Sequence, residues 1–490
     1  MRVRRRLAGT LALAAAVVLA GASAGTAVNS ARSATAGRPG AQTLTVSGTQ
    51  WGTSSCYIGA TEGNVRFNVQ DLVDAGINTY RIYGGMSRWE AQDDDGVYGS
   101  PTIDQIKANP NVINWSWWDT IMTTPPNGSD YWWSGTAGNT WPGNARTIFS
   151  ALQSAGIKVV LTLRNVDNNG NPAWAAQLNP PVDQNGWNEW WEHVFATVYW
   201  LDVRNHYNVT DFEVHNEPNN SGQGWGGTEA QYFQLVQQTK DAIDYVFRSY
   251  LPGMAYHVYA PVTSGGSSWP NDALLQVGSS FDSVDVHDYN SDVRSYVEQV
   301  HGWMNADGYP SDPLWLSEWA TYRGGYQNAS TGVSLLLKNL IYMSYPGNDY
   351  VYGSHLFTFY DWAGFNGAFQ NFQGLDAADG TRRSSFYALQ MATRALEGCR
   401  PTYQSTTSSS NLLAITTKDA AGHYDLLVLN LSAHRTYSVT ADLSQLLATG
   451  AGTEWQYDAS HNDTIVGSPS LSNGHLTFSI PGTAAILIQF

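Results

Sequence analysis

The chain has 490 residues, with 25 Lys and Arg against 41 Asp and Glu and a formal net charge of −16. So acidic a balance argues against nucleic acid and anionic membrane surfaces as partners, because both require a basic footprint. The length is sufficient for one large domain and one small domain.

The N-terminus begins M-R-V-R-R-R, continues with a mostly apolar run from Leu7 to Leu19 and then reaches Ala22-Ser23-Ala24. A basic start, an apolar centre and an A-x-A end are typical of a secretory signal peptide. We therefore expect residues 1–24 to be a signal peptide and the mature protein to be secreted. A membrane anchor is the alternative, although the apolar run is short for a membrane span. Residues 25–42 are expected to form a flexible leader.

Strand-like apolar runs then alternate with stretches of helical apolar spacing. We expect strands at residues 44–51, 77–83, 157–163, 212–215, 256–260, 281–287, 314–318 and 350–359. We expect helices at residues 64–75, 147–155, 187–199, 230–250, 293–304, 333–343 and 386–396. Strand and helix alternating in this way predict a parallel sheet, and eight units favour a closed (β/α)8 TIM barrel, here over residues 43–403.

After a Ser- and Thr-rich stretch at residues 406–410, the pattern changes to short alternating runs separated by turn residues. These runs are residues 412–416, 424–431, 436–441, 454–457, 475–480 and 484–490. They predict a small all-β sandwich over residues 404–490. No polar constellation stands out in it, so a structural flank on the barrel is favoured over a separate ligand-binding module.

A long segment from Arg88 to Asn144 interrupts the alternation. It is rich in aromatic residues, which are Trp89, Trp115, Trp117, Trp118, Tyr131, Trp132, Trp133 and Trp141. Long loops on a barrel usually carry function, and this one follows a predicted strand. We predict that it forms a wall of a substrate groove; the alternative is an aromatic cluster that packs on itself.

The two cysteines, Cys56 and Cys399, would link the start of the main domain to its end if they formed a disulfide. Pairing geometry cannot be deduced from sequence, so that question stays open here. The acidic loops at residues 93–96 and 167–170 offer oxygen ligands of the kind that calcium prefers. Turn chemistry explains both loops more simply, and we expect neither a metal nor a cofactor.

Two predicted strands lead directly to a glutamate. Residues 212–215 precede Asn216-Glu217-Pro218, and residues 314–316 precede Ser317-Glu318-Trp319. Strand ends of one barrel meet at its carboxyl-end face, where active sites lie. Retaining hydrolysis of a glycosidic bond requires two carboxyl groups about 5–5.5 Å apart, one as proton donor and one as nucleophile. Glu213, four residues before Glu217, points to the same side of its strand and is a rival acid.

Further polar and aromatic residues are expected at the same strand ends, and they are Arg81, Tyr83, Arg164, Asn165, Asn216, His287, Tyr289, Tyr360 and Trp362. Arg81 and Tyr289 are predicted to hydrogen-bond Glu318 and so favour its charged form. His287 is interpreted as a supporting donor, and Asn165 and Tyr360 as substrate-binding residues. The simpler interpretations are a structural Arg81–Glu318 ion pair and aromatic rings that only pack.

The motifs F-E-V-H-N-E-P-N and L-S-E-W resemble those of clan A of the glycoside hydrolases, and the first is most similar to family 39. The resemblance covers residues 43–400, although His215 and Thr210 stand where tryptophan is usual in that family. It implies that Glu217 is the general acid/base, that Glu318 is the nucleophile and that Asn216 contacts the sugar 2-hydroxyl. Trp362 would then be a stacking platform for the sugar.

The sequence therefore predicts a secreted, monomeric, metal-independent retaining glycoside hydrolase that acts on a plant or microbial polysaccharide or its oligosaccharides. One alternative is a non-catalytic carbohydrate-binding protein on a degenerate barrel. A transglycosylase is another, since it differs only in the acceptor. The sugar, the linkage and the choice between exo and endo action stay open.

Overall fold

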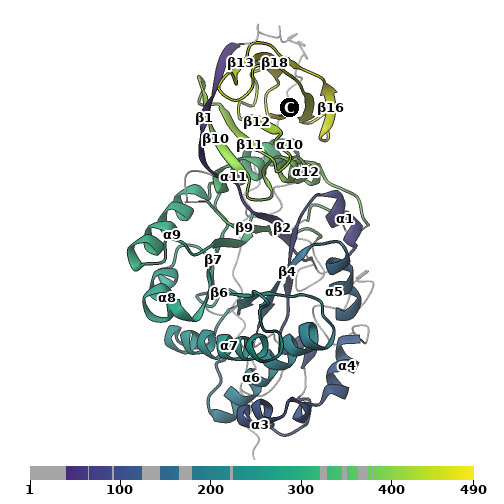
Figure 1. Cartoon of the computed structure of the whole chain (residues 1–490), viewed down its shortest axis with the longest axis vertical. Coiled ribbons are helices and arrows are strands. Elements are labelled where there is room, and N and C mark those ends of the chain that lie inside the picture. Colours follow the sequence, from purple (N-terminus) through teal and green to yellow (C-terminus); the bar gives the residue numbers. More distant parts are fainter. Residues whose placement is uncertain are drawn as a thin grey trace, which may run out of the picture. The chain divides into compact units, whose positions relative to one another are not determined.

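Among the residues that the structure describes, eight parallel strands close into a barrel in chain order. They are β2 (Tyr57–Thr61), β3 (Thr79–Tyr83), β4 (Lys158–Leu163), β5 (Asp211–Val214), β6 (His257–Thr263), β7 (Ser283–Asp288), β8 (Leu314–Trp319) and β9 (Gly353–Leu356). Helices surround this barrel (Figure 1). The predicted (β/α)8 fold is thereby confirmed.

The computed structural model describes residues 40–63, 66–90, 93–123, 144–164, 179–220, 224–320, 328–344, 350–361, 374–377 and 379–490. The predicted signal peptide, most of the predicted leader, the acidic loop at residues 167–170, Asn165 and Trp362 lie outside these ranges.

The described α-helices are α1 (Val69–Asp74), α2 (Met86–Trp89), α3 (Ile103–Ala108), α4 (Trp115–Thr123), α5 (Ala145–Ser154), α6 (Gln184–Val198), α7 (Glu229–Tyr250), α8 (Trp269–Val277), α9 (Arg294–Asp307), α10 (Ala329–Thr331), α11 (Lys338–Met343) and α12 (Ser384–Leu396). The longest, α7, begins with a capping box in which the side chains and backbone amides of Thr228 and Gln231 satisfy each other. In the described ranges, no helix combines the length and the apolar character that a membrane crossing needs.

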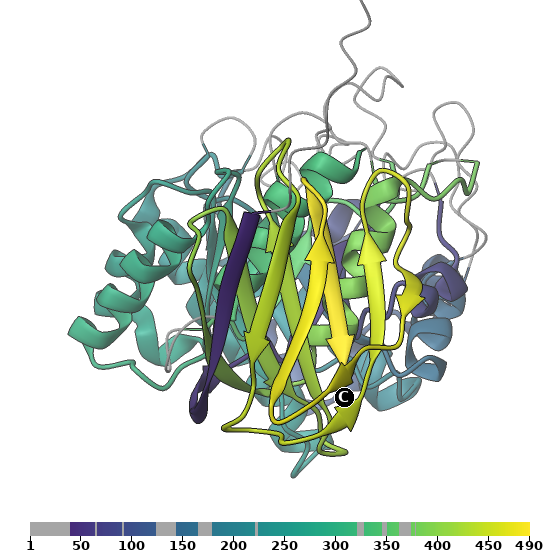
Figure 2. The same ribbon diagram turned by 90° about the horizontal axis from the view of Figure 1, so that it is seen from above.

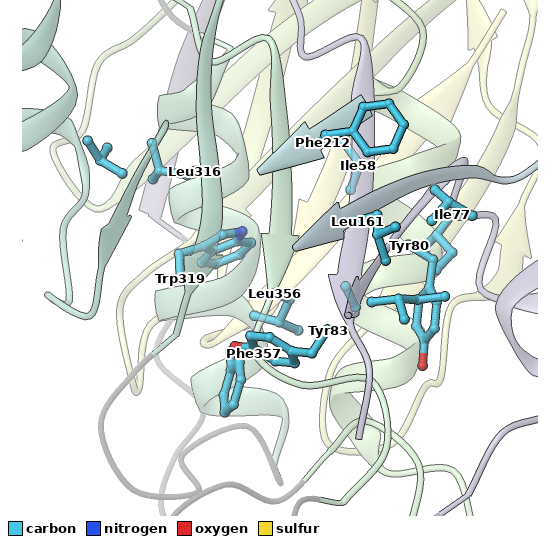
Figure 3. Packing of buried hydrophobic residues seen from close by; sticks show 14 of the residues in the cluster. Ile58, Ile77, Tyr80, Tyr83, Leu161, Phe212, Leu316, Trp319, Leu356 and Phe357 are labelled. Carbon is cyan, nitrogen blue, oxygen red and sulfur yellow. The ribbon is translucent and has the colours of Figure 1, made fainter. Parts of the chain in front are cut away.

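Apolar residues fill both sides of the barrel wall. Val160, Tyr259 and Trp315 pack together as one cluster. Residues such as Ile58, Leu161 and Phe212 belong to the larger cluster that includes the surrounding helices (Figure 3). Because successive side chains of a strand point to opposite faces, strands covered on both sides appear as continuous apolar runs.

The first predicted strand, residues 44–51, is not part of the barrel. It lies in β1 (Gly40–Thr53), which pairs with β10 (Pro401–Thr407) and with β13 (Tyr437–Asp442) in a second sheet. The first barrel strand is instead β2, which the apolar pattern did not reveal because its centre is Gly59 and Ala60. Glycine is needed there, since a Cβ on Gly59 would lie 1.9 Å from the carbonyl oxygen of Thr79.

In the described part of the chain, the second sheet has nine strands in the order β16-β15-β19-β12-β11-β10-β1-β13-β18. The remaining members are β11 (Leu412–Lys418), β12 (Tyr424–Asn430), β15 (Thr453–Tyr457), β16 (Thr464–Gly467), β18 (His475–Ile480) and β19 (Ala484–Gln489), while β14 (Gly450–Ala451) pairs with β17 (Ser470–Leu471). Its strands are antiparallel except for the β1–β13 pair. Figure 2 shows purple β1 among strands from the C-terminal end.

This sheet confirms the expected C-terminal β domain, but its limits differ from the prediction. It includes β1, and β10 crosses the expected boundary between residues 403 and 404. One face of β12 contributes Leu427 and Leu429 to the cluster of the barrel, whereas Leu426 and Val428 belong to a core of the sheet's own. The β domain is thus packed directly on the barrel.

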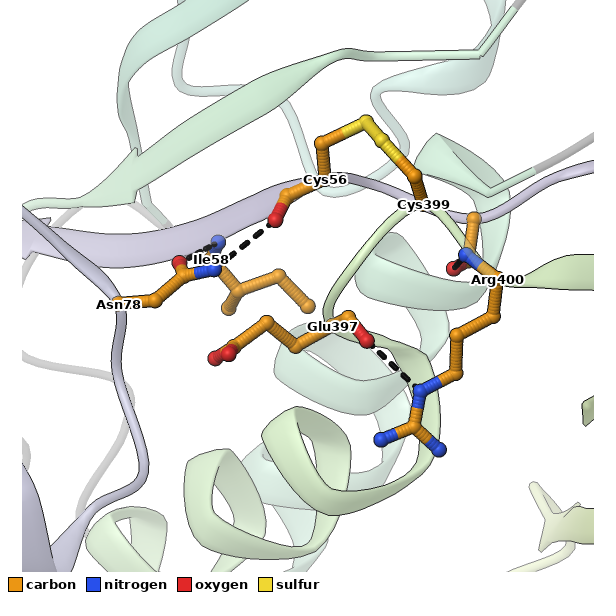
Figure 4. Close-up of a disulfide and its surroundings, with 7 residues drawn as sticks. Cys56, Ile58, Asn78, Glu397, Cys399 and Arg400 are labelled. Carbon is orange, nitrogen blue, oxygen red and sulfur yellow. Dashed lines mark hydrogen bonds between the residues drawn. A yellow bond between two sulfur atoms is a disulfide. The ribbon is translucent and has the colours of Figure 1, made fainter. Parts of the chain in front are cut away.

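Helix α12 carries much of that contact. Arg394 lies 2.8 Å from Asp463 and 3.8 Å from the ring of Trp455. Cys56 and Cys399 form a disulfide that links the β1–β2 connection to the α12–β10 connection (Figure 4). These contacts fit the expected structural flank.

Candidate active site

Glu217 and Glu318 meet at the carboxyl ends of β5 and β8, the fourth and seventh strands of the barrel. One oxygen of each carboxyl group and one ring nitrogen of His287 all lie within 4.8 Å of one another. Inverting hydrolysis needs carboxyl groups about 6.5–9.5 Å apart, whereas retaining hydrolysis needs about 5–5.5 Å. The nearest oxygens of Glu217 and Glu318 are therefore close enough for the arrangement that retaining hydrolysis needs.

The backbone after β5 is bent so that Glu217 faces this gap. His215 and Glu217 have positive φ angles of 69° and 46°, a region that non-glycine residues rarely adopt outside strained or functional sites. The Glu217 N–H donates to the carbonyl oxygen of Val262 on β6 at 2.9 Å. On the other side, Gly224 approaches so closely that a Cβ would lie 1.7 Å from the Glu217 carbonyl oxygen.

A bulge in β8 positions Glu318. Val286 pairs with Leu316 and His287 pairs with Glu318, so Ser317 is an extra residue in β8. The Ser317 N–H donates to Oδ1 of Asp285 at 3.2 Å. This local shift places His287 and Glu318 opposite each other at the strand ends.

Glu318 is surrounded by donors. Arg81 Nη1 donates to its Oε1 at 2.6 Å, Tyr83 donates to the same oxygen, and the Tyr289 hydroxyl donates to Oε2 at 2.6 Å. Burial alone would raise the pKa of Glu318. The charges of His287 and Arg81 and the hydroxyls of Tyr289 and Tyr83 outweigh burial and lower the pKa to about 2. Glu318 is therefore ionised, as a nucleophile must be.

Glu217 has a different environment. His287 Nδ1 lies 2.9 Å from its Oε1, and Asn220 Nδ2 donates to its Oε2 at 3.1 Å. The same His287 Nδ1 lies 3.5 Å from Glu318, and Nε2 contacts Ser317 Oγ at 3.2 Å. His287 thus contacts both carboxyl groups through one ring nitrogen.

Arg81 connects Glu318 to the rest of the site. Its Nε donates to both carboxylate oxygens of Glu213 at 2.8 and 2.7 Å, and its Nη2 donates to Asn216 Oδ1 at 2.8 Å. Glu213 also accepts from Thr162 Oγ1 at 2.6 Å and is fully buried. The rival assignment of Glu213 as a catalytic acid is therefore wrong, because its oxygens are engaged inside the barrel.

The structure brings most of the predicted site residues together, namely Arg81, Asn216, Glu217, His287, Tyr289 and Glu318. Tyr360 is a correction. Its side chain is fully buried and its hydroxyl donates to the carbonyl oxygen of Asn68 at 2.7 Å, so it packs against the start of α1 instead of meeting substrate. Asn165 and Trp362 are outside the described residues. Asn220 and Ser317 were not predicted, and their nearness in sequence to the two acids was the available signal.

The predicted aromatic wall is also corrected in part. Trp89 and Trp118 are almost completely buried in the main apolar cluster, and Trp115 stacks on Tyr199 with ring centroids 5.0 Å apart. This part of the segment follows the alternative of aromatic packing. Tyr131, Trp132, Trp133 and Trp141 lie outside the described residues.

The eight-stranded barrel, the paired glutamates at its fourth and seventh strand ends and the C-terminal β domain match the arrangement that the resemblance to clan A glycoside hydrolases led us to expect. Among similar solved structures, the family 39 enzyme from Xanthomonas axonopodis pv. citri is 15% identical, with 94% of this chain and 99% of that chain covered and a TM-score of 0.62. A monomeric β-xylosidase from Caulobacter crescentus is 16% identical, with 92% and 99% covered and a TM-score of 0.63.

A family 30 endoxylanase from Clostridium papyrosolvens is 13% identical, with 91% of this chain and 99% of that chain covered and a TM-score of 0.62. At such identities the likeness establishes the fold. It confirms the expected resemblance to clan A, with family 39 among the similar structures. No protein-family model and no curated protein matches the sequence.

Proposed function

We propose that the protein is a retaining glycoside hydrolase that cleaves O-glycosidic bonds in a plant or microbial polysaccharide or its oligosaccharides by double displacement. The observation that carries this proposal is the Glu217–Glu318 pair, whose oxygens approach within 4.8 Å. The two acids differ as the mechanism requires. Glu318 is held ionised by three hydrogen-bond donors and by the charge of His287, while Glu217 contacts the His287 ring.

In the first step, a carboxylate oxygen of Glu318 attacks the anomeric carbon and the bond from that carbon to the leaving oxygen breaks. Glu217 gives its proton to the leaving oxygen, so an alcohol departs and a glycosyl ester on Glu318 remains. In the second step, Glu217 takes a proton from water as the water oxygen attacks the same carbon. The ester bond breaks, Glu318 is regenerated, and the product keeps the starting anomeric configuration.

Arg81, Tyr83 and Tyr289 prepare Glu318 for this attack. Their hydrogen bonds hold the carboxylate charged and fixed in direction before the sugar arrives. Asn216 is oriented by Arg81, which occupies its Oδ1 and leaves the amide N–H groups as donors. That orientation supports a bond from Asn216 to the sugar 2-hydroxyl, which strengthens at the transition state.

Secretion forms part of the proposal. The basic and apolar N-terminus supports export. The Cys56–Cys399 disulfide adds support, because disulfides persist in oxidising compartments.

The test is a screen of the mature protein against xylan, arabinan, mannan, β-glucan and galactan, with sizing of the products. Xylan and arabinan come first because similar solved structures include an endoxylanase, a β-xylosidase and an arabinofuranosidase. Glu217→Gln and Glu318→Ala should each abolish turnover, and NMR of the first product should show retention. Inversion would exclude double displacement, and tight glycan binding in calorimetry without any hydrolysis would favour a non-catalytic binding protein.

A further inference from the structure

Six acidic side chains gather where the segment after α2 packs against α6. They are Glu90, Asp93, Asp94, Asp95, Glu189 and Glu192, and we refer to them as the acidic cluster. Four of them are buried, with exposed fractions of 1% for Glu90, 6% for Asp94, and 1% each for Glu189 and Glu192. Acids are almost never so buried unless they are paired.

Contacts between the two elements show that α6 turns one face toward this segment. His193 Nδ1 lies 2.8 Å from Glu90 Oε2, and the Gly99 N–H donates to Glu189. Glu189, Glu192 and His193 are spaced three and four residues apart, so they share that face. Glu192 lies on the same face and is 1% exposed. Glu192 therefore faces the segment that carries Asp93, Asp94 and Asp95.

Within the described residues, the acidic cluster has no matching positive charge. Among the described ion pairs, none joins Lys or Arg to any of its six members. His193, beside Glu90, is the one basic partner found in the described ranges. Both carboxylate oxygens of Glu192 are buried without a hydrogen-bond partner among the described residues, as are Glu90 Oε1 and Asp94 Oδ2. Buried carboxylates in this state are costly unless a counter-charge is supplied.

The spacing of the oxygens suits a hard divalent cation. Asp93, Asp94 and Asp95 each offer one carboxylate oxygen, and the three oxygens lie within 4.8 Å of one another. Ca²⁺ binds oxygen ligands at about 2.3–2.6 Å, so ligand oxygens on opposite sides of the ion are about 5 Å apart. Carboxylates without thiols favour Ca²⁺ or Mg²⁺ over softer metals. Ca²⁺ is the better match, since Mg²⁺ usually keeps several waters and binds few carboxylates.

We propose that the acidic cluster binds one Ca²⁺ ion through Asp93, Asp94 and Asp95, and that the buried, unpaired carboxyl group of Glu192 on the facing helix α6 completes the site. The ion supplies the positive charge that the described side chains lack, and it fastens residues 93–99 to α6. This site revises our expectation from sequence that turn chemistry alone explains the loop at residues 93–96. It is independent of the proposed glycosidase activity, because neither Glu217 nor Glu318 takes part.

The test uses the full mature protein after treatment with EDTA and removal of the chelator. Calorimetric titration with CaCl₂ should show about one ion per chain, and Ca²⁺ should raise the melting temperature. Tb³⁺ should give luminescence sensitised by Trp118, whose ring centroid lies 5.9 Å from that of His193, and Ca²⁺ should quench it by displacement. Asp94→Asn and Glu192→Gln should each weaken Ca²⁺ binding about tenfold or more, a loss typical of disturbed metal sites.

Three further variants make the outcome decisive. Asp95 is exposed, so Asp95→Asn should fold normally and still weaken binding, even if a buried variant fails to fold. Glu397→Gln removes a carboxyl group at the end of α12 and should bind Ca²⁺ like the native protein. Glu318→Gln alters the second place in the described ranges where three potential ligand groups meet, and it should also bind Ca²⁺ normally. The proposal is overturned if the native protein takes up no Ca²⁺, if the three acidic-cluster variants bind like the native protein, or if only Glu318→Gln loses the ion.

Discussion

Arg81 Nε lies 2.7 Å from Glu213 Oε2, and neither side chain is exposed to solvent. The same guanidinium group donates to Glu318 and to Asn216 through its other two nitrogens. Glu213 therefore fixes the orientation of the Arg81 guanidinium group. In that orientation Arg81 donates to both Glu318, the proposed nucleophile, and Asn216, the proposed sugar-binding amide. One buried ion pair aligns two functional groups.

Replacing Glu213 should consequently lower kcat more than the loss of a buried ion pair elsewhere in the barrel would. Breaking a buried ion pair destabilises a protein by about 3–5 kcal/mol. For Glu213→Gln we expect a loss of that order or smaller, because glutamine keeps the shape and one acceptor. We also expect kcat to fall about tenfold or more, since Arg81 loses the charged partner that holds its Nε and fixes the direction of the guanidinium group. Steady-state kinetics on the folded fraction, together with urea unfolding, measure both effects.

Asp211 provides the matched control for that experiment. It lies on the same strand two residues earlier, is buried, and pairs with Lys158 at 2.5 Å. Asp211→Asn should lower stability while kcat per folded molecule stays unchanged. Equal kcat values for Glu213→Gln and Asp211→Asn would show that Glu213 has only a structural role.

Removing the hydroxyl of Tyr289 should shift the pH dependence of kcat/KM. A hydrogen bond to a charged group contributes about 1.5–3 kcal/mol, and one pKa unit corresponds to about 1.4 kcal/mol. Tyr289→Phe should therefore raise the pKa of Glu318 in the free enzyme by about one to two units from its low value of about 2. The acid limb of kcat/KM should move to higher pH by that amount.

Tyr360→Phe is the control for this shift, because the Tyr360 hydroxyl contacts Asn68 and not Glu318. Its acid limb should coincide with that of the native enzyme. A Tyr289→Phe profile that also coincides with the native one would show that another group sets the limb.

Stability should decline as pH rises through neutrality, and Asp376 is one named cause. Burial, followed by the nearby charge of Asp71, raises the pKa of Asp376 from 3.8 to about 7, despite the opposing charges of Arg382 and Arg66. A raised pKa in the folded state means that the stabilising effect is complete below about pH 4 and is lost as pH rises through about 7. Melting temperatures should thus be higher at pH 5 than at pH 8. Asp376→Asn should flatten that difference, whereas Asp379→Asn, on the surface, should leave it intact.

Much of the barrel could be predicted from sequence because its strands are local apolar runs between turn residues. The acids Glu217 and Glu318 could be predicted because each directly follows such a run. The place of β1 in the second sheet could not be predicted, since β1 pairs with residues far away in the sequence, as in Leu44 opposite Thr407. Pattern analysis sees only neighbours in sequence.

Side-chain contacts between strands could not be predicted from the sequence either. Arg81 reaches Glu213 across β4, and that contact depends on the register of β3, β4 and β5, which aligns Arg81 with Val160 and Val160 with Asp211. Tyr360 was predicted at the site because it follows a barrel strand. Its rotation toward Asn68 depends on packing around α1 that the local sequence does not encode.

The disulfide offers a final test of how the two sheets support each other. Cys56 and Cys399 are separated by 343 residues, and their bond links the entry to the barrel with the exit from α12. Closing so long a loop restricts the unfolded chain, and removal of a native disulfide typically costs about 2–5 kcal/mol. The double variant Cys56→Ser/Cys399→Ser should lose stability of that order in urea unfolding but keep its kcat below its melting temperature, because neither sulfur touches the candidate active site. Reductant should destabilise the native protein to the same extent and leave the double variant unaffected; equal stability of all three samples would show that the packing of α12 against the β domain suffices alone.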